Sequence, residues 1–339
     1  MVTTDMAYCS PSRSETAKKQ APGDASCFTK EQLVRLAEAW NSTSASGARG
    51  PIAGMAKMTK TALWGALNDR MNTECGGSGR EWCWADKLAA RTPKPAEIEA
   101  SLRPKKPKEW YSAPRTWLTN LDIDAVMRQY DMDVAPQYKY RFLGVYPIDF
   151  AKKSAFGKCL FAEICSLNFK RMYTQGIRYV GIITNLDKHN EGGSHWTSVF
   201  MCIDPKMSCF GAHYYDSFAR APPPEIGEFV ASINAQIAPM AKKPFELDYN
   251  RQQHQFENSE CGLFAMAYQI RWLTLLRTHS VSTRSRPLTI DKVTDININD
   301  KIIHELRDVL YRPSRGGGRA GIKASSKNKI KGPKETKAK

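Results

Sequence analysis

Cys261 is the residue best placed in this sequence for nucleophilic chemistry. The apolar positions after it recur at three- and four-residue steps, which predicts a buried helix. Those positions are Leu263, Phe264, Met266, Ala267, Ile270 and Leu273. A thiol in the first turn of a helix faces unpaired amides and the positive end of the helix dipole, which favours thiolate over thiol. The alternative is a small apolar side chain packed at the start of a helix.

A thiolate nucleophile needs an imidazole partner, a group that orients the imidazole, and donors for the oxyanion. His195 opens the strand-like run HWTSVF, and Asp216 ends the aromatic run HYYD. If these runs pair as a hairpin, the start of one lies beside the end of the other, which brings the two side chains together. Gln255 precedes Cys261 by six residues in a loop and can donate amide hydrogens to an oxyanion, together with the backbone amide of Cys261.

Other residues compete for these roles. His189, His213 and His254 are alternative imidazoles. Asp204 also ends a strand, but it closes the run that His195 opens, so it should lie roughly 30 Å away at the rise of a strand. Each candidate also has an ordinary reading, since a histidine at a strand start is commonly a surface residue and an aspartate before serine commonly forms a turn.

The elements that must position these residues follow from composition and periodicity. Four short strand-like runs are predicted at 178–186, 195–204, 210–217 and 245–250. A helix is expected after Trp117, with Leu121, Ile123, Val126 and Met127 buried, and a last helix is expected to bury Ile302, Leu306 and Leu310. These elements indicate a mixed α+β domain of roughly 200 residues.

The chain divides by composition into five parts. We expect a disordered N-terminus at 1–26, a small helical N-terminal module at 27–92, a Pro/Lys-rich linker at 93–109, the main domain at 110–311 and a disordered basic tail at 312–339. In the module, Thr29 and Gln32 predict a capping box ahead of a helix with Leu33 and Trp40 on one face.

The net charge of +16 is concentrated at the C-terminus. The segment 312–339 carries ten Lys or Arg residues and a single acid, Glu335, with few apolar side chains. Such a segment cannot bury enough surface to fold alone. It is either a solubilising tail or a nonspecific contact with DNA or an acidic partner that salt would weaken.

The sequence contains nine cysteines, an odd number without repeated close pairing. No apolar run is long enough to span a bilayer, and the first residues lack the apolar core of a secretion signal, so we expect cytosolic or nuclear residence without membrane contact. Most thiols should then be free. A zinc site at Cys75 and Cys83 is the weaker alternative.

The order of these residues resembles a known peptidase superfamily. His195-Trp196, an aromatic strand ending at Asp216, and Gln-x5-Cys-Gly heading a helix are similar to the superfamily that contains the adenovirus protease and the SUMO-specific proteases. The segment WLTNLDIDAVM resembles that family's Trp-Leu-Asn-Asp helix. The resemblance implies a permuted papain-like α+β core, a central mixed sheet packed on helices, and no cofactor or metal.

Site roles follow from the same resemblance. Cys261 is implied as nucleophile, His195 as base, Asp216 as orienting acid and Gln255 as oxyanion donor, while Trp196 and Trp117 match aromatics that line a narrow tunnel over substrate glycines. Glu260 stands where the relatives often carry Asp.

The N-terminal extension resembles those of virion-maturation proteases of large nucleocytoplasmic DNA viruses, such as the African swine fever virus protease. This likeness favours cleavage of viral structural polyproteins after Gly-Gly-like sites, in the virion and the host cytoplasm. One alternative is a ubiquitin-like-protein protease acting on host conjugates. The other is a catalytically silent scaffold that binds nucleic acid through the basic tail.

Overall fold

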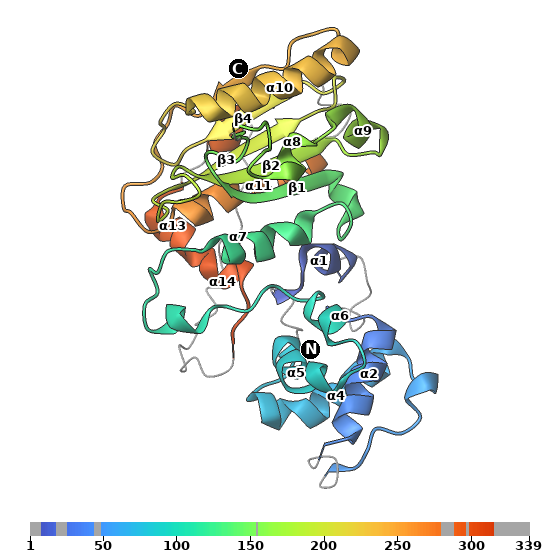
Figure 1. Ribbon diagram of the computed structural model, residues 1–339. Coiled ribbons are helices and arrows are strands. Elements are labelled where there is room, and N and C mark those ends of the chain that lie inside the picture. The colour runs from blue at the N-terminus through green and yellow to red at the C-terminus, as the bar shows by residue number, and fades with distance from the viewer. Residues whose placement is uncertain are drawn as a thin grey trace, which may run out of the picture.

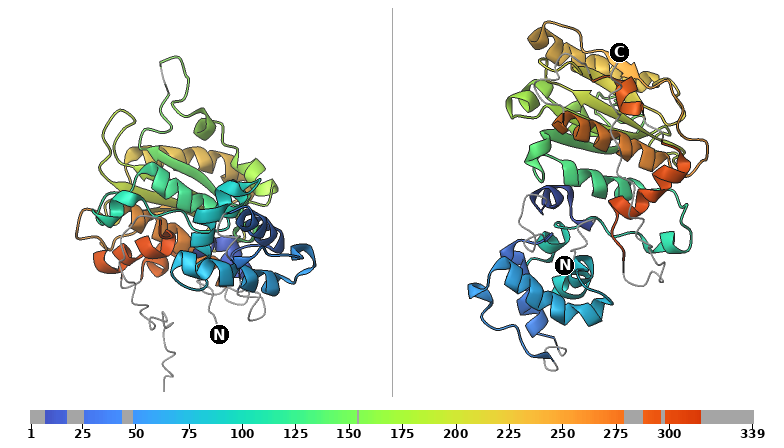
Figure 2. Two further views of the ribbon diagram at one scale, coloured as in Figure 1. Left: turned by 90° about the horizontal axis from the view of Figure 1, so that it is seen from below. Right: turned by 180° about the vertical axis from the view of Figure 1, so that it is seen from behind.

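The computed structural model describes residues 8–17, 26–43, 49–153, 155–278, 288–295 and 298–314. Figures 1 and 2 show a helical N-terminal module beside a larger body that contains a sheet between helices. The two parts have separate hydrophobic cores. The predicted α+β class is confirmed, and the basic residues from 315 onward lie outside the described residues.

A five-stranded mixed sheet forms the centre of the larger body. In the order β1-β2-β3-β4-β5, its strands are Tyr140–Pro147, Tyr179–Asn185, Trp196–Cys202, Gly211–Tyr215 and Leu247–Tyr249. The outer pairs β1/β2 and β4/β5 are parallel, whereas β2/β3 and β3/β4 are antiparallel. The four predicted strands are present in shortened form, and β1 was not predicted.

Each strand sends alternate side chains to opposite faces, as the pleat requires. In β2, Ile182 packs on one core and Ile183 on the other. Helix α10 (Pro224–Ala241), absent from the prediction, covers the Ile182 face, and α11 (Cys261–Thr278) covers the Ile183 face. The nucleophile therefore begins a helix that is fixed against the sheet.

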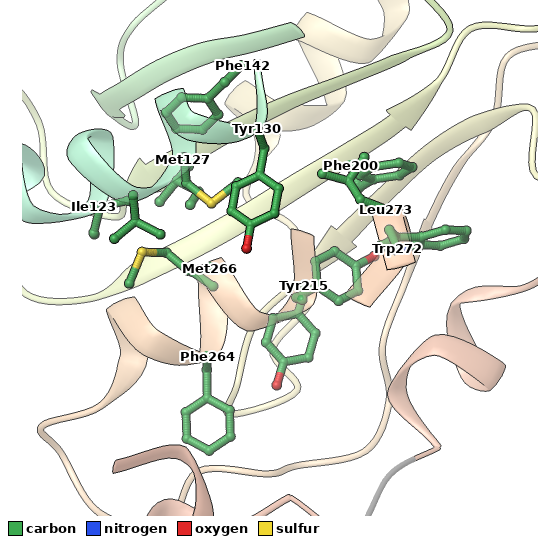
Figure 3. Close-up of a cluster of buried hydrophobic side chains, with 14 of the residues drawn as sticks. Ile123, Met127, Tyr130, Phe142, Phe200, Tyr215, Phe264, Met266, Trp272 and Leu273 are labelled. Atoms are coloured by element: carbon green, nitrogen blue, oxygen red, sulfur yellow. The ribbon is translucent and has the colours of Figure 1, made fainter. Parts of the chain in front are cut away.

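The core around α11 is rich in aromatic rings, as Figure 3 shows. Phe200 of β3 stacks on Trp272 of α11 with ring centroids 4.9 Å apart. Met266 and Leu273 of the same helix are also buried here. Truncating a buried tryptophan to alanine typically costs about 3–5 kcal/mol, so this contact anchors α11 to the sheet that carries His195.

The N-terminal module packs short helices around its own core. They are α2 (Lys30–Asn41), α4 (Lys60–Cys75), α5 (Glu81–Leu88) and α6 (Pro95–Glu99), whereas α1 (Pro11–Ala17) contacts Arg128–Tyr130 of the larger body. The predicted capping box is present, because Thr29 and Gln32 bond each other's backbone amides. Three of the predicted boundaries differ from the structure. Helix α1 falls within the expected disordered N-terminus, and Ile98 of the expected linker is buried in the module's core.

The third boundary difference concerns Arg312, which was assigned to the disordered tail. Its guanidinium is buried and pairs with Asp86 and Glu99 of the N-terminal module. We call residues 300–312 the C-terminal strap, because they run from the larger body to this anchor. The strap also contains α13 (Asp300–Glu305) and α14 (Arg307–Leu310).

Two predicted inward positions are wrong. Leu121, on α7 (Asn120–Met127), and Ile302 are exposed, while Ile123, Val126 and Met127 are buried as expected. The last helix is broken between α13 and α14, and within α13 the buried residue is Ile303 rather than Ile302. The remaining helices are α8 (Ala162–Cys165), α9 (Phe169–Thr174) and α12 (Ile290–Thr294). No helix in the described part of the chain has the length and apolar character needed to span a bilayer.

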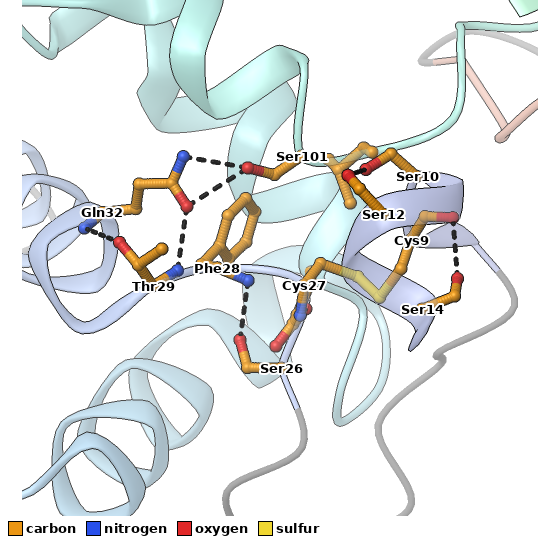
Figure 4. The surroundings of a disulfide bond; sticks show 12 residues. Cys9, Ser10, Ser12, Ser14, Ser26, Cys27, Phe28, Thr29, Gln32 and Ser101 are labelled. Atoms are coloured by element: carbon orange, nitrogen blue, oxygen red, sulfur yellow. Dashed lines mark hydrogen bonds between the residues drawn. A yellow bond between two sulfur atoms is a disulfide. The ribbon is translucent and has the colours of Figure 1, made fainter. Parts of the chain in front are cut away.

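The expectation that most thiols are free is wrong for six of the cysteines. The structure pairs Cys9–Cys27, Cys75–Cys83 and Cys159–Cys165 as disulfides, and Cys202, Cys209 and Cys261 are free. The fold brings the paired residues together from helix ends and loops. Figure 4 shows the first bridge joining the start of α1 to the segment before α2. Because Cys75 and Cys83 are oxidised, the zinc alternative at this pair is not supported.

Candidate active site

Cys261 is the first residue of α11 and is almost fully buried. The carbonyl of Glu260 accepts the backbone hydrogen bond of Phe264, 3.0 Å from its nitrogen, and so begins the helical ladder. The sulfur therefore lies at the amide-rich end of an 18-residue helix. This environment stabilises a thiolate.

His195 and Asp216 meet at one edge of the β3/β4 hairpin. The strands are antiparallel, with Ser198 opposite Tyr215, so the residue before β3 and the residue after β4 are neighbours. The Nε2 atom of His195 lies 2.8 Å from Oδ1 of the fully buried Asp216. The backbone amide of Phe218 donates to the same carboxylate oxygen, which fixes its orientation.

The imidazole of His195 contacts both the acid and the thiol. Burial lowers its pKa, but hydrogen bonds and charge interactions with Asp216 and Cys261 outweigh burial and raise the pKa from 6.5 to about 9. Because Nε2 is bonded to Asp216, Nδ1 is the ring nitrogen left for Cys261. This arrangement favours an imidazolium–thiolate pair, which can attack a carbonyl and then protonate a leaving amine.

Gln255 is fully buried, and short hydrogen bonds fix its side chain. The hydroxyl of Ser217 donates to Oε1 at 2.6 Å, and Nε2 donates to the carbonyl of Glu257 at 2.6 Å. An amide nitrogen carries two hydrogens, so the other is left for a substrate oxyanion. Ser217 directly follows Asp216, and one turn thus holds both the orienting acid and the oxyanion candidate.

Comparisons with known proteins show which proteins this chain resembles. No protein-family profile matches the chain. A provisionally named thiol protease of Acanthamoeba polyphaga mimivirus is 25% identical over 283 residues, which are 79% of this chain and 85% of that protein. A SUMO-1 cysteine protease of African swine fever virus is 23% identical over 133 residues, 39% of this chain and 43% of that protein.

Solved structures agree on the fold. The crystal structure of the African swine fever virus protease aligns with a TM-score of 0.53 at 14% identity, covering 92% of this chain and 98% of that one. The chain is a cysteine peptidase, similar in sequence to these two viral proteases and in fold to the African swine fever virus protease.

The two tryptophans matched by the resemblance differ in their exposure to solvent. The indole of Trp196 is half-buried and donates to the carbonyl of Leu118 at 3.0 Å. A Cβ on Gly262 would lie 3.2 Å from both Trp196 and Leu118, so glycine after the nucleophile lets these groups approach closely. Trp117 is 46% exposed, and its ring is free to contact a polypeptide.

The competing residues have other partners. Asp204 forms an ion pair with Arg178, 3.4 Å apart, beyond the far end of β3. His189 pairs with Asp149 at 2.7 Å, and His213 lies within hydrogen-bond distance of the carbonyl of Cys209. His254 pairs with the hydroxyl of Tyr215.

Three supporting residues escaped the sequence analysis. Asn250 accepts from the backbone amide of Asp216 at 2.9 Å and donates to its carbonyl. Phe218 packs on the imidazole of His195 with ring centroids 5.1 Å apart, and Arg220 pairs with Asp216 at 3.2 Å. The run Asp-Ser-Phe-Ala-Arg after the strand was a signal for the last two. Asn250 carried no signal in the sequence. It follows β5, and only the pairing of β5 with β4 in the fold brings it to Asp216.

Among the described residues, one group has metal-ligand geometry: Cys9, Cys27 and Glu81 of the N-terminal module. The two thiols are joined in a disulfide, and the Glu81 carboxylate accepts hydrogen bonds from Trp64 and the amide of Cys27. These atoms are therefore engaged, and the group does not fit a resident metal.

Proposed function

We propose that this cysteine peptidase is an endopeptidase that cuts viral structural polyproteins after Gly-Gly-like sites. The observation that carries the proposal is the close packing beside the nucleophile, where Trp196, Leu118 and Gly262 are in contact and Trp117 is exposed next to them. Substrate residues that pass such rings must be small, which favours glycine on both sides of the attacked carbonyl.

The proposed reaction uses the residues already described. The Cys261 thiolate attacks the glycyl carbonyl carbon, and the oxyanion is held by Gln255 and the backbone amide of Cys261. His195 transfers its proton to the leaving amine as the peptide bond breaks. Water, deprotonated by His195, then hydrolyses the thioester and regenerates the thiol pair.

The viral role is supported by the source of the relatives. Both are encoded by large DNA viruses, and the mimivirus relative spans most of this chain, including much of the N-terminal half. We place the enzyme in the virion and the viral factory of the host cytoplasm. The basic tail, outside the described residues, is proposed to retain it on packaged DNA through contacts that weaken with salt.

The test is to incubate the enzyme with candidate structural precursors and to sequence the new N-termini. Cuts after Gly-Gly support the proposal, and the Cys261→Ala variant must give none. A folded SUMO–glycine fusion, offered beside short Gly-Gly-x peptides, distinguishes a polyprotein-processing protease from a ubiquitin-like-protein protease. A preference for the folded modifier would support the second candidate, a SUMO-like protease, which the name of the African swine fever virus relative favours.

Gln255 provides a sharper test of the chemistry. Replacing it with alanine should lower kcat by roughly 100- to 1000-fold if it supplies one oxyanion donor, with little change in KM. The measurement is steady-state hydrolysis of a fluorogenic Gly-Gly peptide. Turnover unchanged from the wild type would remove Gln255 from the oxyanion site, and complete lack of labelling of Cys261 by a Gly-Gly aldehyde would favour the silent scaffold.

A further inference from the structure

A fully buried carboxylate stands directly before the nucleophile. Glu260 is 1% exposed, and both of its oxygens have partners. Its Oε1 lies 2.7 Å from Nδ1 of His304, and its Oε2 accepts from Nη2 and Nε of Arg307 at 2.8 and 3.2 Å. Arg307 is equally buried. Both partners belong to the C-terminal strap, so a segment far along the chain holds the residue next to Cys261.

Arg307 also reaches the loop that carries Trp117. Its Nη2 donates to the carbonyl of Thr116 at 2.9 Å, and its guanidinium stacks 4.4 Å from the ring centre of Trp110. One planar cation thus contacts the nucleophile loop and the substrate loop together, through an arrangement of donors that the point charge of an ammonium lacks.

Two further contacts join the substrate loop to the nucleophile loop. Arg115 forms an ion pair with Glu257, and Leu118 packs within van der Waals distance of Gly262. Residues 115–118 therefore run alongside residues 257–262, with Arg307 bridging them near the middle.

We infer that Glu260 and Arg307 form a positioning pair, in which Arg307 neutralises the carboxylate beside the Cys261 thiolate and holds the substrate loop against the nucleophile loop. The inference rests on the peptidase activity but not on the Gly-Gly specificity. A carboxylate next to a thiolate opposes its charge unless a cation compensates it. A buried arginine performs this task without contacting substrate.

The charged groups that belong to this part of the site come from five elements. His195 precedes β3 and Asp216 follows β4, with Arg220 on the outer side of Asp216. Glu260 precedes α11, and His304 and Arg307 approach from α13 and α14. The helix dipole and His195 favour the thiolate, whereas Glu260 opposes it. Each substitution therefore has an expected direction of effect on the reactivity of Cys261.

The experiment compares Arg307→Gln, Glu260→Gln and the double variant by the rate at which iodoacetamide alkylates Cys261 at neutral pH. We expect Arg307→Gln to slow alkylation by about tenfold or more, because Glu260 loses its buried cation and keeps only the partly exposed His304 as a partner. Glu260→Gln should not slow it. The double variant should recover most of the rate lost in Arg307→Gln, because both charges are absent.

Arg307→Lys tests the second proposed role of Arg307, which is to hold the substrate loop against the nucleophile loop. It keeps the charge but loses the planar link to Thr116, so alkylation should stay near the wild-type rate while KM for a peptide rises several-fold. The matched control is Asp308→Asn, on the same strap but in an exposed ion pair with Lys106, which should change neither readout.

Equal slowing of alkylation in Arg307→Gln and Glu260→Gln would mean a loss of packing and overturn the inference. Wild-type alkylation in Arg307→Gln would overturn it as well. Unfolding temperatures of all variants identify any that fail to fold, and Arg307→Lys then remains informative. Alkylation needs no substrate, so failure of the Gly-Gly proposal leaves this result readable.

Discussion

At the scale of residues, the site depends on one imidazole shared between an acid and a thiol. Asp216 occupies Nε2 of His195, and the sulfur of Cys261 is left with Nδ1. The acid is fully buried and its carboxylate accepts from the backbone amide of Phe218, so it keeps the ring in one orientation. The imidazole is thus already oriented before substrate arrives.

This arrangement predicts the pH dependence. The pKa of His195 is raised from 6.5 to about 9 by Asp216 and Cys261, against the effect of burial. The charged imidazole therefore contributes stability that is fully present below pH 6.5 and is lost as the pH rises through about 9. We expect kcat/KM to decline near pH 9, and the decline to move to lower pH in Asp216→Asn. An unchanged alkaline limb in that variant would contradict the assigned pairing.

Gly262 predicts a second effect at this scale. A methyl group there would lie 3.2 Å from Leu118 and Trp196 and 3.3 Å from Ile123. Gly262→Ala should lower the free energy of unfolding by roughly 1–3 kcal/mol and, by displacing Trp196, raise KM. Denaturant unfolding and peptide kinetics measure the two effects. Gly227→Ala is the control, because a Cβ there meets no atom within 4 Å.

At the scale of elements, a hairpin and a helix bring the catalytic residues together. The strands β3 and β4 set His195 beside Asp216, and α11, fixed by the Phe200–Trp272 stack, brings Cys261 to the same edge. The disulfides also act at this scale, because each joins two segments that are close together in the sequence.

The Cys9–Cys27 bridge should stabilise the N-terminal module. It spans 18 residues, for which the entropy of loop closure gives about 3 kcal/mol. Replacing both cysteines by serine should lower the module's unfolding midpoint, which the fluorescence of Trp40, Trp64 and Trp84 reports. The Cys159/Cys165 double serine variant is the control, because that bridge lies in the larger body. A module midpoint equal to that of the wild type would contradict the prediction.

Periodicity and capping residues predicted most of the positioning elements, including α2, α7, α11 and four strands. They missed β1, because its register shifts between Phe142 and Gly144 and breaks the alternation. They also missed the disulfides, since pairing depends on distances that only the fold creates. Glu260 was noticed at its position, but its partners lie 44 and 47 residues away in sequence, beyond any local pattern.

At the scale of the whole molecule, the C-terminal strap joins two cores. One end holds Glu260 beside the nucleophile, and the other inserts Arg312 between Asp86 and Glu99 of the N-terminal module. The peptide of Arg312 also bonds the backbone of Pro104 and Lys106. The module and the active site are therefore connected through one short segment.

Arg312→Gln should weaken that connection. Removing a buried cation leaves Asp86 compensated only by the half-exposed Lys105, and we expect a loss of about 3 kcal/mol in the free energy of unfolding. Lys106→Ala, which breaks an exposed pair with Asp308, should cost less than about 1 kcal/mol. Thermal unfolding followed by calorimetry compares the two. Equal losses of unfolding free energy in the two variants would show that the buried Arg312 pair stabilises the protein no more than an exposed ion pair does.

The position of Arg307 in the chain also orders the assembly of these contacts. Cys261, His195 and Asp216 are translated before residue 307, so the bonds of Arg307 to Glu260 and Thr116 can form only after the two loops that they join have left the ribosome. The strap is therefore added to loops that precede it, and Arg312 follows five residues later.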